Sequence, residues 1–157
     1  MGVEIERKFL LRDSGWRAHV AESVGLRQGY LSVVRNRVVR IRLVNDAQGY
    51  LTIKGERHGD RRTEFEYAIP PQDAASMLDH QCLRPLIEKV RHRLDLTPGE
   101  WTVDEFTGAN AGLVLAEIEL PEGESVHDLP PWLGEEVTED DRYANAYLQE
   151  HPYSTWR

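Results

Sequence analysis

Apolar and polar residues alternate with a period of two along most of this chain, as they do in strands with one apolar face. The segments with this pattern are 3–11, 29–34, 38–44, 50–55, 62–69, 88–96, 100–106 and 113–120. Turn-forming sequences, such as 45–49 and 97–99, separate several of them. The pattern predicts about eight antiparallel strands, arranged as a sandwich or a barrel.

Three further stretches have helical character. Residues 13–22 begin with two cap-forming side chains, residues 72–83 follow a pair of prolines, and residues 140–150 follow Thr138 in an arrangement that resembles a capping box. No linker or repeat divides the chain, so we expect a single domain over residues 1–157.

The polar face of nearly every predicted strand is ionic, because charged residues recur at every second position. Neighbouring charges along one strand usually have the same sign. The cations of these faces are Lys8, Arg40, Arg42, Lys54, Lys89, Arg91 and Arg93. The anions are Glu4, Glu6, Glu64, Glu66, Asp104, Glu117 and Glu119.

These ionic faces allow two arrangements. In the first, a half-buried sheet exposes its charges to water. In the second, the strands close into a barrel with the charges inside and the apolar faces outside. Like charges two residues apart repel each other, and protein surfaces usually intersperse the signs, which favours the barrel. Enclosed charges are very costly unless they are paired, wet or neutralised by a ligand, so such a barrel indicates a functional site.

The overall charge limits the kind of ligand. The chain has 157 residues, with 19 Lys and Arg against 27 Asp and Glu, and a formal net charge of −8. This balance argues against nucleic acid but is compatible with a small anionic ligand in a basic cavity. The single cysteine, the absence of a long apolar run and the charged N-terminal residues predict a cytoplasmic protein without a membrane partner.

The residue types of the ionic faces suggest a specific chemistry. Carboxylates without histidine or cysteine partners suit Mg²⁺ or Mn²⁺ rather than zinc. Lysine and arginine side chains from separate strands suit a chain of phosphates better than a single phosphate. Neither glycine-rich phosphate-binding motif is present, and no serine or cysteine has a supporting catalytic arrangement.

The segment VEIERKF at residues 3–9 resembles the E-x-E-x-K signature of the CYTH family, the triphosphate tunnel metalloenzymes. The resemblance continues through residues 27–31, 40–42, 51–55, 64–67, 89–91, 103–106, 116–120, 132–138 and 141–143. It therefore covers almost the whole chain. It implies an α+β protein, mainly antiparallel β, with an eight-stranded closed barrel that binds triphosphates together with a divalent metal.

The resemblance also implies roles for individual residues. The metal ligands are expected to be Glu4, Glu6 and Glu119, with Glu117 as a further candidate. The phosphate contacts are expected to be Arg40, Arg42, Lys54, Lys89 and Arg91. Lys89 is also placed among the catalytic residues, together with Lys8 and Tyr30.

Several of these roles have alternatives. Lys8 is expected either to pair with a carboxylate or to contact a terminal phosphate. Tyr30 is expected to hold Lys8 or to position the attacking water, and the alternative is a tyrosine that only packs within its strand. The remaining acidic residues orient the cations, hold a second metal or form internal ion pairs; they are Glu64, Glu66 and Asp104.

Two supporting arginines are less well matched. Arg93 departs from the family pattern, which is often aromatic near this position. Arg142 begins a C-terminal helix, at residues 138–151, that is expected to plug one end of the tunnel; a plain surface position is the alternative.

The expected activity is Mg²⁺- or Mn²⁺-dependent hydrolysis of inorganic triphosphate, because the short chain lacks an obvious nucleobase-binding domain. The alternatives within the same tunnel are a purine-nucleotide cyclase and a nucleoside or thiamine triphosphatase. A non-catalytic polyphosphate-binding module is the alternative of a different class. A small anionic substrate is the expected partner, and the protein is expected to be a monomer or a homodimer.

Overall fold

A computed structural model describes residues 2–59 and 61–156 of the chain, with side chains from Ile5 onward. The strands are β1 (Gly2–Leu11), β2 (Val20–Val34), β3 (Arg37–Val44), β4 (Gln48–Gly55), β5 (Arg61–Ile69), β6 (Ile87–Leu94), β7 (Glu100–Thr107), β8 (Val114–Leu120) and β9 (Leu133–Glu136). The helices are α1 (Pro71–His80) and α2 (Asn145–Glu150), and four short 3₁₀ segments are η1 (Gly15–His19), η2 (Gly108–Asn110), η3 (Asp141–Tyr143) and η4 (Tyr153–Thr155).

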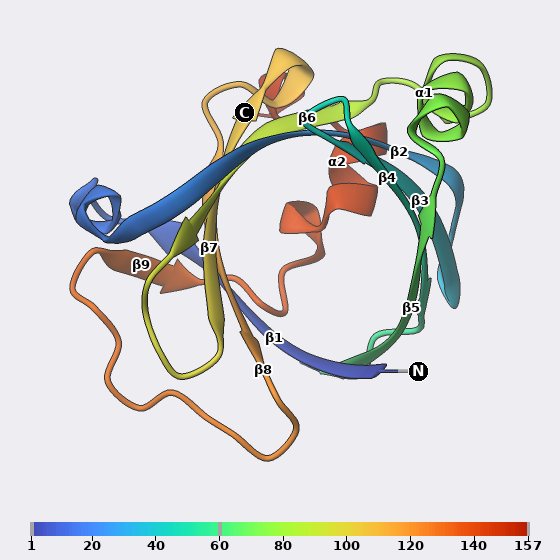
Figure 1. Cartoon of the computed structure of the whole chain (residues 1–157). Coiled ribbons are helices and arrows are strands. Elements are labelled where there is room, and N and C mark those ends of the chain that lie inside the picture. Colours follow the sequence, from blue (N-terminus) through green and yellow to red (C-terminus); the bar gives the residue numbers. More distant parts are fainter. Residues whose placement is uncertain (1, 60, 157) are drawn as a thin grey trace.

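Eight strands close into an antiparallel barrel, viewed along its axis in Figure 1. Their order is β5-β4-β3-β2-β6-β7-β8-β1, and β1 closes the ring by pairing with β5 over Gly2–Ile5. Further along β1, Phe9 and Leu11 pair with the additional strand β9. The predicted eight-stranded closed barrel is therefore confirmed, with β9 as an addition that the sequence pattern did not indicate.

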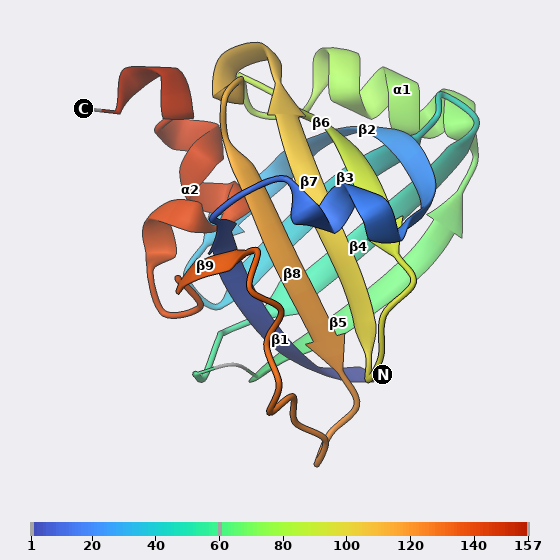
Figure 2. The same cartoon turned by 90° about the vertical axis from the view of Figure 1, so that its left-hand side faces the viewer.

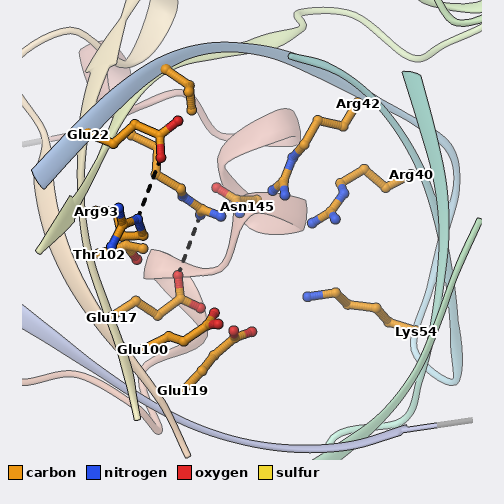
Figure 3. A pocket seen from close by; sticks show the side chains of 12 residues that line it. Glu22, Arg40, Arg42, Lys54, Arg93, Glu100, Thr102, Glu117, Glu119 and Asn145 are labelled. Carbon is orange, nitrogen blue, oxygen red and sulfur yellow. Dashed lines mark ion pairs between the residues drawn. The ribbon is translucent and has the colours of Figure 1, made fainter. Parts of the chain in front are cut away.

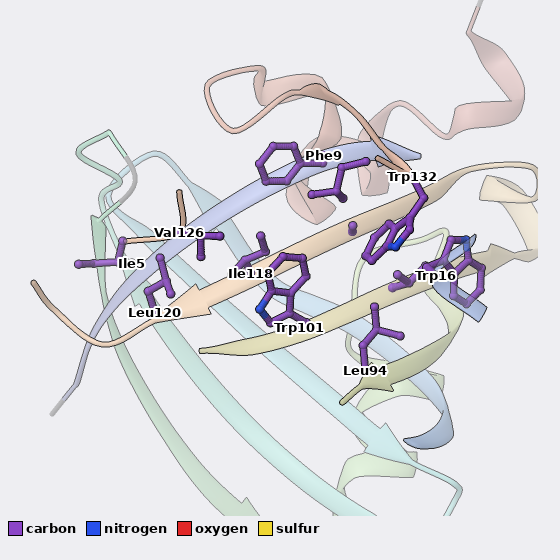
Figure 4. Close-up of a cluster of buried hydrophobic side chains, with 12 residues drawn as sticks. Ile5, Phe9, Trp16, Leu94, Trp101, Ile118, Leu120, Val126 and Trp132 are labelled. Carbon is purple, nitrogen blue, oxygen red and sulfur yellow. The ribbon is translucent and has the colours of Figure 1, made fainter. Parts of the chain in front are cut away.

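The apolar face of the barrel points outward and is covered by other segments. One buried cluster includes Phe9, Trp101, Ile118 and Trp132, drawn in Figure 4. Figure 2 shows β9 and the segment before it lying over β1 and β8. Each large side chain buried in this way contributes roughly 1.5–3 kcal/mol, so the protein obtains its apolar core outside the barrel and leaves the interior for polar groups.

Helix α1 covers a second part of the outer face. Ala74 and Leu78 of the helix are fully buried against Ile41 and Leu43 of β3. The prediction of a helix over residues 72–83 is therefore close, with Pro71 at its first turn, where proline needs no hydrogen-bond partner.

Helix α2 lies within the ring of strands in the view of Figure 1. Its Leu148 is fully buried in a cluster that includes Tyr30, Phe106 and Leu115 from the barrel. Residue Gln149 donates to the backbone oxygen of Arg84 at 2.8 Å. Helix α2 therefore packs against apolar side chains of the strands.

The predicted helix over residues 13–22 is wrong. Only Gly15–His19 forms a 3₁₀ turn, and the chain enters β2 at Val20, which pairs with Leu94. Isolated short helices are marginal, whereas pairing with β6 satisfies the backbone groups along the whole segment. The sequence pattern also placed the start of this strand too late, because β2 runs over Val20–Val34.

The C-terminal helical stretch is divided in two. The 3₁₀ segment η3 and helix α2 replace one continuous helix, and Asp140 caps η3 by accepting from the Arg142 backbone nitrogen at 3.1 Å. The hydroxyl of Thr138, instead of capping, accepts from the Lys8 backbone nitrogen at 3.0 Å and donates to Glu136 at 2.6 Å. In the part of the chain that is described, every helix is too short or too polar to cross a membrane.

Candidate active site

The barrel encloses a cavity of about 270 Å³. Its lining cations are Arg40, Arg42, Lys54, Arg91 and Arg93, and its lining carboxylates are Glu22, Glu100, Glu117 and Glu119. Figure 3 shows Arg40, Arg42 and Lys54 entering the cavity from one side and Glu100, Glu117 and Glu119 from the opposite side. The cavity therefore has a basic wall and an acidic wall and has the size of a small-ligand site.

The acidic wall follows from the strand register. Glu6 of β1 lies opposite Glu119 of β8, and Glu119 in turn lies opposite Glu100 of β7. Lys8 lies opposite Glu117 in the same way. Because side chains at paired positions share a face of the sheet, this register gathers acidic groups from three strands.

Glu6 and Glu117 are hydrogen-bonded to each other. Burial raises the pKa of Glu117, and the negative charge of Glu6 raises it further. Burial also acts to raise the pKa of Glu6, but Lys8 and the hydrogen bond from Glu117 outweigh it and lower this pKa to about 2. The two carboxyl groups are therefore coupled: the charged form is favoured at Glu6 and disfavoured at Glu117.

The remaining predicted metal ligands are less defined. Burial raises the pKa of Glu119. The backbone of Glu4 pairs with Arg62, but its side chain lies outside the described residues. Within the described residues, no group of three or more acidic, histidine or cysteine side chains is close enough to hold a metal ion.

The basic wall carries two guanidinium groups that are held by neutral partners. Arg40 donates to the Thr52 hydroxyl at 3.1 Å, and Arg42 donates to the side-chain oxygen of Gln28 at 2.9 Å. Among the described side chains, no carboxylate lies within ion-pair distance of either arginine. Burial lowers the pKa of Arg42 well below its ordinary value, and the positive charges of Arg40 and Arg91 lower it further.

Lys54 completes the basic wall. Its ammonium group lies 3.7 Å from the carboxylate of Glu64. Burial lowers the pKa of Lys54 to about 8, and the positive charge of Arg40 adds to this effect, while Glu6 and Glu64 oppose it. Lys54 is therefore largely charged at neutral pH and loses its charge at moderately alkaline pH.

Lys89 and Arg91 are paired with Asp104 of the neighbouring strand. The Lys89 ammonium lies 2.7 Å from the carboxylate, and Arg91 donates two hydrogen bonds to it at 2.8 and 2.9 Å. Burial acts to raise the pKa of Asp104, but Arg91 and Lys89 hold it far below its ordinary value. The Lys89 ammonium also lies 3.5 Å from the side-chain oxygen of Asn145, which connects the ion-paired group to α2. The centre of the Phe106 ring lies 5.0 Å from the same ammonium.

The two other predicted catalytic residues are buried. Lys8 donates its ammonium to the backbone oxygen of Tyr143 at 3.1 Å. Burial raises the pKa of Tyr30, although Arg40 and Arg42 act against this. Lys8 and Tyr30 are not hydrogen-bonded to each other in the described part of the chain.

The supporting residues are distributed differently. Arg93 is half-exposed, lines the cavity and lies 3.6 Å from Glu22. Glu66 is exposed on β5 and opposite Thr52 of β4. Arg142 is exposed, forms a two-pronged pair with Asp140 and does not line the cavity.

Three cavity-lining residues, and Gln28 beside the lining residue Arg42, were not identified from the sequence. Glu100 shares the inner face with Thr102 and Asp104, so alternation along β7 is a signal that could have found it. Glu22 was placed in a predicted helix. Gln28 and Asn145 are uncharged, and a search for ionic faces does not detect them.

The fold and the site together define a closed antiparallel barrel with an ionic interior. Residues 2–147 match the CYTH domain model, and the chain belongs to this family. The resemblance found in the sequence is thereby confirmed.

Named relatives are similar over nearly their whole length. The chain is 44% identical over 157 residues to an inorganic triphosphatase of Acetivibrio thermocellus, with 100% of this chain and 99% of that protein covered. It is 34% identical over 154 residues to an inorganic triphosphatase of Nitrosomonas europaea, with coverages of 92% and 95%. A solved structure of an inorganic triphosphatase has a TM-score of 0.65 and 32% identity, and 95% of each chain is covered.

Proposed function

We propose that this protein hydrolyses triphosphates in a reaction that depends on a divalent metal, with inorganic triphosphate as the preferred substrate. The observation that carries the proposal is the pair Arg40 and Arg42, whose charges face the cavity and have only neutral partners among the described side chains. A linear polyanion would compensate these charges. The names of the two relatives support inorganic triphosphate as the substrate.

Mg²⁺ or Mn²⁺ is the cofactor that the acidic wall suits best. Glu6 and Glu117 are in hydrogen-bond contact, so a cation bound to both would relieve the repulsion that raises the pKa of Glu117, and carboxylate oxygens are hard ligands. Glu119 and Glu4 are the further ligands that we propose. A divalent ion supplies charge neutralisation and alignment of the phosphate chain when bound.

The basic wall would bind and orient the phosphate chain. Arg40, Arg42 and Lys54 would contact phosphate oxygens from one side, and their charges stabilise the negative charge that develops during phosphoryl transfer. Asp104 would hold Lys89 and Arg91 in place for the same purpose. Lys8 and Tyr30 lie at the α2 end, where they would position the terminal phosphate or the attacking water.

The C-terminal segment over residues 138–151 would close this end of the tunnel. The buried position of Leu148 and the contact of Asn145 with Lys89 support this role. We further propose that the whole chain forms one domain, that it acts in the cytoplasm as a monomer or homodimer, and that it binds neither nucleic acid nor membranes.

A substrate panel tests the proposed function. We expect inorganic triphosphate to yield orthophosphate and pyrophosphate with Mg²⁺ or Mn²⁺, and EDTA to abolish the release. Chromatography of the products separates the alternatives. Cyclic AMP from ATP would indicate a cyclase, faster turnover of ATP or thiamine triphosphate would indicate another triphosphatase, and binding without turnover would indicate a polyphosphate-binding module.

The charge of Lys54 predicts a pH dependence of substrate binding. Its pKa of about 8 means that the ammonium form is lost above that pH, so KM for inorganic triphosphate should rise by about tenfold between pH 7 and pH 9. The folded state, in contrast, should become more stable as pH rises. Between about pH 8 and pH 10.5, Lys54 is protonated in the unfolded chain but not in the folded chain, so the free energy of unfolding increases with pH.

Steady-state kinetics across this pH range measures the effect. The control is Lys54→Arg, which stays charged and should show no comparable rise of KM. The same rise in both proteins would assign the pH dependence to another group.

A further inference from the structure

The tunnel cations are held in two different ways. Lys89 and Arg91 are ion-paired with the carboxylate of Asp104, and Arg91 also lies 3.8 Å from Glu117. Arg40 and Arg42 are oriented instead by the uncharged side chains of Thr52 and Gln28. The second arrangement keeps each guanidinium in place without reducing its positive charge.

Gln28 is built into the barrel wall beside Arg42. The two residues are paired in the register of β2 and β3, and Gln28 is fully buried. Its side-chain oxygen accepts from the Arg42 Nε at 2.9 Å, while its buried amide nitrogen makes no hydrogen bond of good geometry and only acts to lower the pKa of the nearby Tyr30 hydroxyl. An unsatisfied buried donor costs about 1–3 kcal/mol.

This arrangement reduces stability in two respects. Arg42 lies among other cations without a carboxylate partner, and the Gln28 amide nitrogen is unsatisfied. Glutamate, which has the same shape as glutamine, would remove both problems by forming an ion pair with Arg42 and eliminating the unused donor. Local arrangements that sacrifice stability are expected at functional sites.

We infer that Gln28 is a positioning residue for the triphosphatase reaction: its oxygen fixes the Arg42 guanidinium toward the cavity, and its neutrality leaves the positive charge free to bind a phosphate group. This inference rests on the proposed function. Gln28 acts through Arg42 and is not itself a catalytic residue.

The test is Gln28→Glu, which preserves the side-chain shape and adds one negative charge. Without substrate, we expect Tm to rise by about 2–4 °C, because the new carboxylate pairs with Arg42. With inorganic triphosphate, we expect KM to rise roughly tenfold or more, because Arg42 is already neutralised. The matched control is Gln72→Glu, which makes the same change on the exposed side of α1 and should alter neither quantity.

A second variant tests whether Gln28 acts on substrate binding through Arg42. Gln28→Met removes the acceptor without adding charge, and it should raise KM by about threefold to tenfold in the wild-type background. In an Arg42→Ala background the same substitution should change KM by less than about twofold, because the group that it positions is absent. Equal effects in both backgrounds would overturn the inference.

Calorimetric binding of inorganic triphosphate by the wild type and Gln28→Glu separates the two proposals. If the wild type binds this anion without hydrolysing it, the proposed function fails, and weaker binding by Gln28→Glu supports only the part of the inference that concerns phosphate binding by Arg42. If the wild type hydrolyses it and Gln28→Glu has an unchanged KM and affinity, only the inference fails.

Discussion

Replacing Glu6 by Gln is expected to lower metal-dependent phosphate release by roughly a hundredfold or more while the protein remains folded. The pKa of Glu6 is lowered to about 2, so this side chain is charged at neutral pH, and we propose that its charge attracts a divalent cation to the acidic wall. Glutamine keeps the size of the side chain but removes this charge. Because Lys8 and the hydrogen bond from Glu117 lower the pKa of Glu6, removing its charge costs some stability at neutral pH, but the protein should remain folded.

Phosphate release measured against Mg²⁺ and Mn²⁺ concentration checks this prediction. The control is Glu124→Gln, which removes one negative charge from an exposed position and should leave turnover unchanged. Full activity of Glu6→Gln at the wild-type metal concentration would contradict the assignment of Glu6 as a metal ligand.

Replacing Asp104 by Ala is expected to reduce the free energy of unfolding by about 3–5 kcal/mol. Asp104 is buried and compensates two cations at once, with Lys89 at 2.7 Å and Arg91 at 2.8 Å. The pKa of Lys89 is about 7 even with Asp104 present, so without Asp104 this lysine would lose its proton at neutral pH. Arg91 would keep its buried charge, with Glu117 at 3.8 Å as its remaining carboxylate. The unpaired polar groups of Lys89 and Arg91 are the source of the expected instability.

Urea unfolding of the variant and the wild type measures this loss. Asp95→Ala serves as the control, because Asp95 is exposed and should tolerate the change within about 0.5 kcal/mol. Inorganic triphosphate should stabilise Asp104→Ala more than the wild type, since the anion replaces part of the missing negative charge. A loss no larger than that of Asp95→Ala would show that the ion pairs contribute little.

The two-residue alternation of charge predicted which side chains share one face of a strand, although Glu66 on the predicted ionic face is exposed and does not line the cavity. Arg40 and Arg42, for example, share a face because strand geometry leaves no other choice for positions two apart. The same rule predicted the outward apolar face of Ile41 and Leu43, which α1 covers. The E-x-E-x-K resemblance then indicated the family, which the family match confirms.

Local pattern failed where contacts distant in sequence decide the structure. Residues after Val20 join β2 because their backbone groups pair with β6. The local sequence around Val20 contains no information about this distant partner. Strand β9 has only four residues, too few to show a period, and it depends on its pairing with β1. The bounds of α2 likewise depend on the apolar end of the barrel that receives Leu148.

The sequence by itself determined that nearly every strand has one ionic and one apolar face, because side-chain alternation and the grouping of charges are properties of the chain alone. The closed barrel was implied by the resemblance to the CYTH family, and the structure confirms it. Only the tertiary structure decided which charges are neutralised and which stay available. Asp104 forms ion pairs with Lys89 and Arg91, whereas Arg40 and Arg42 donate hydrogen bonds to a hydroxyl and to an amide oxygen. Electrostatic pairing depends on distances of a few ångströms between strands far apart in sequence, and these distances exist only once the barrel has closed.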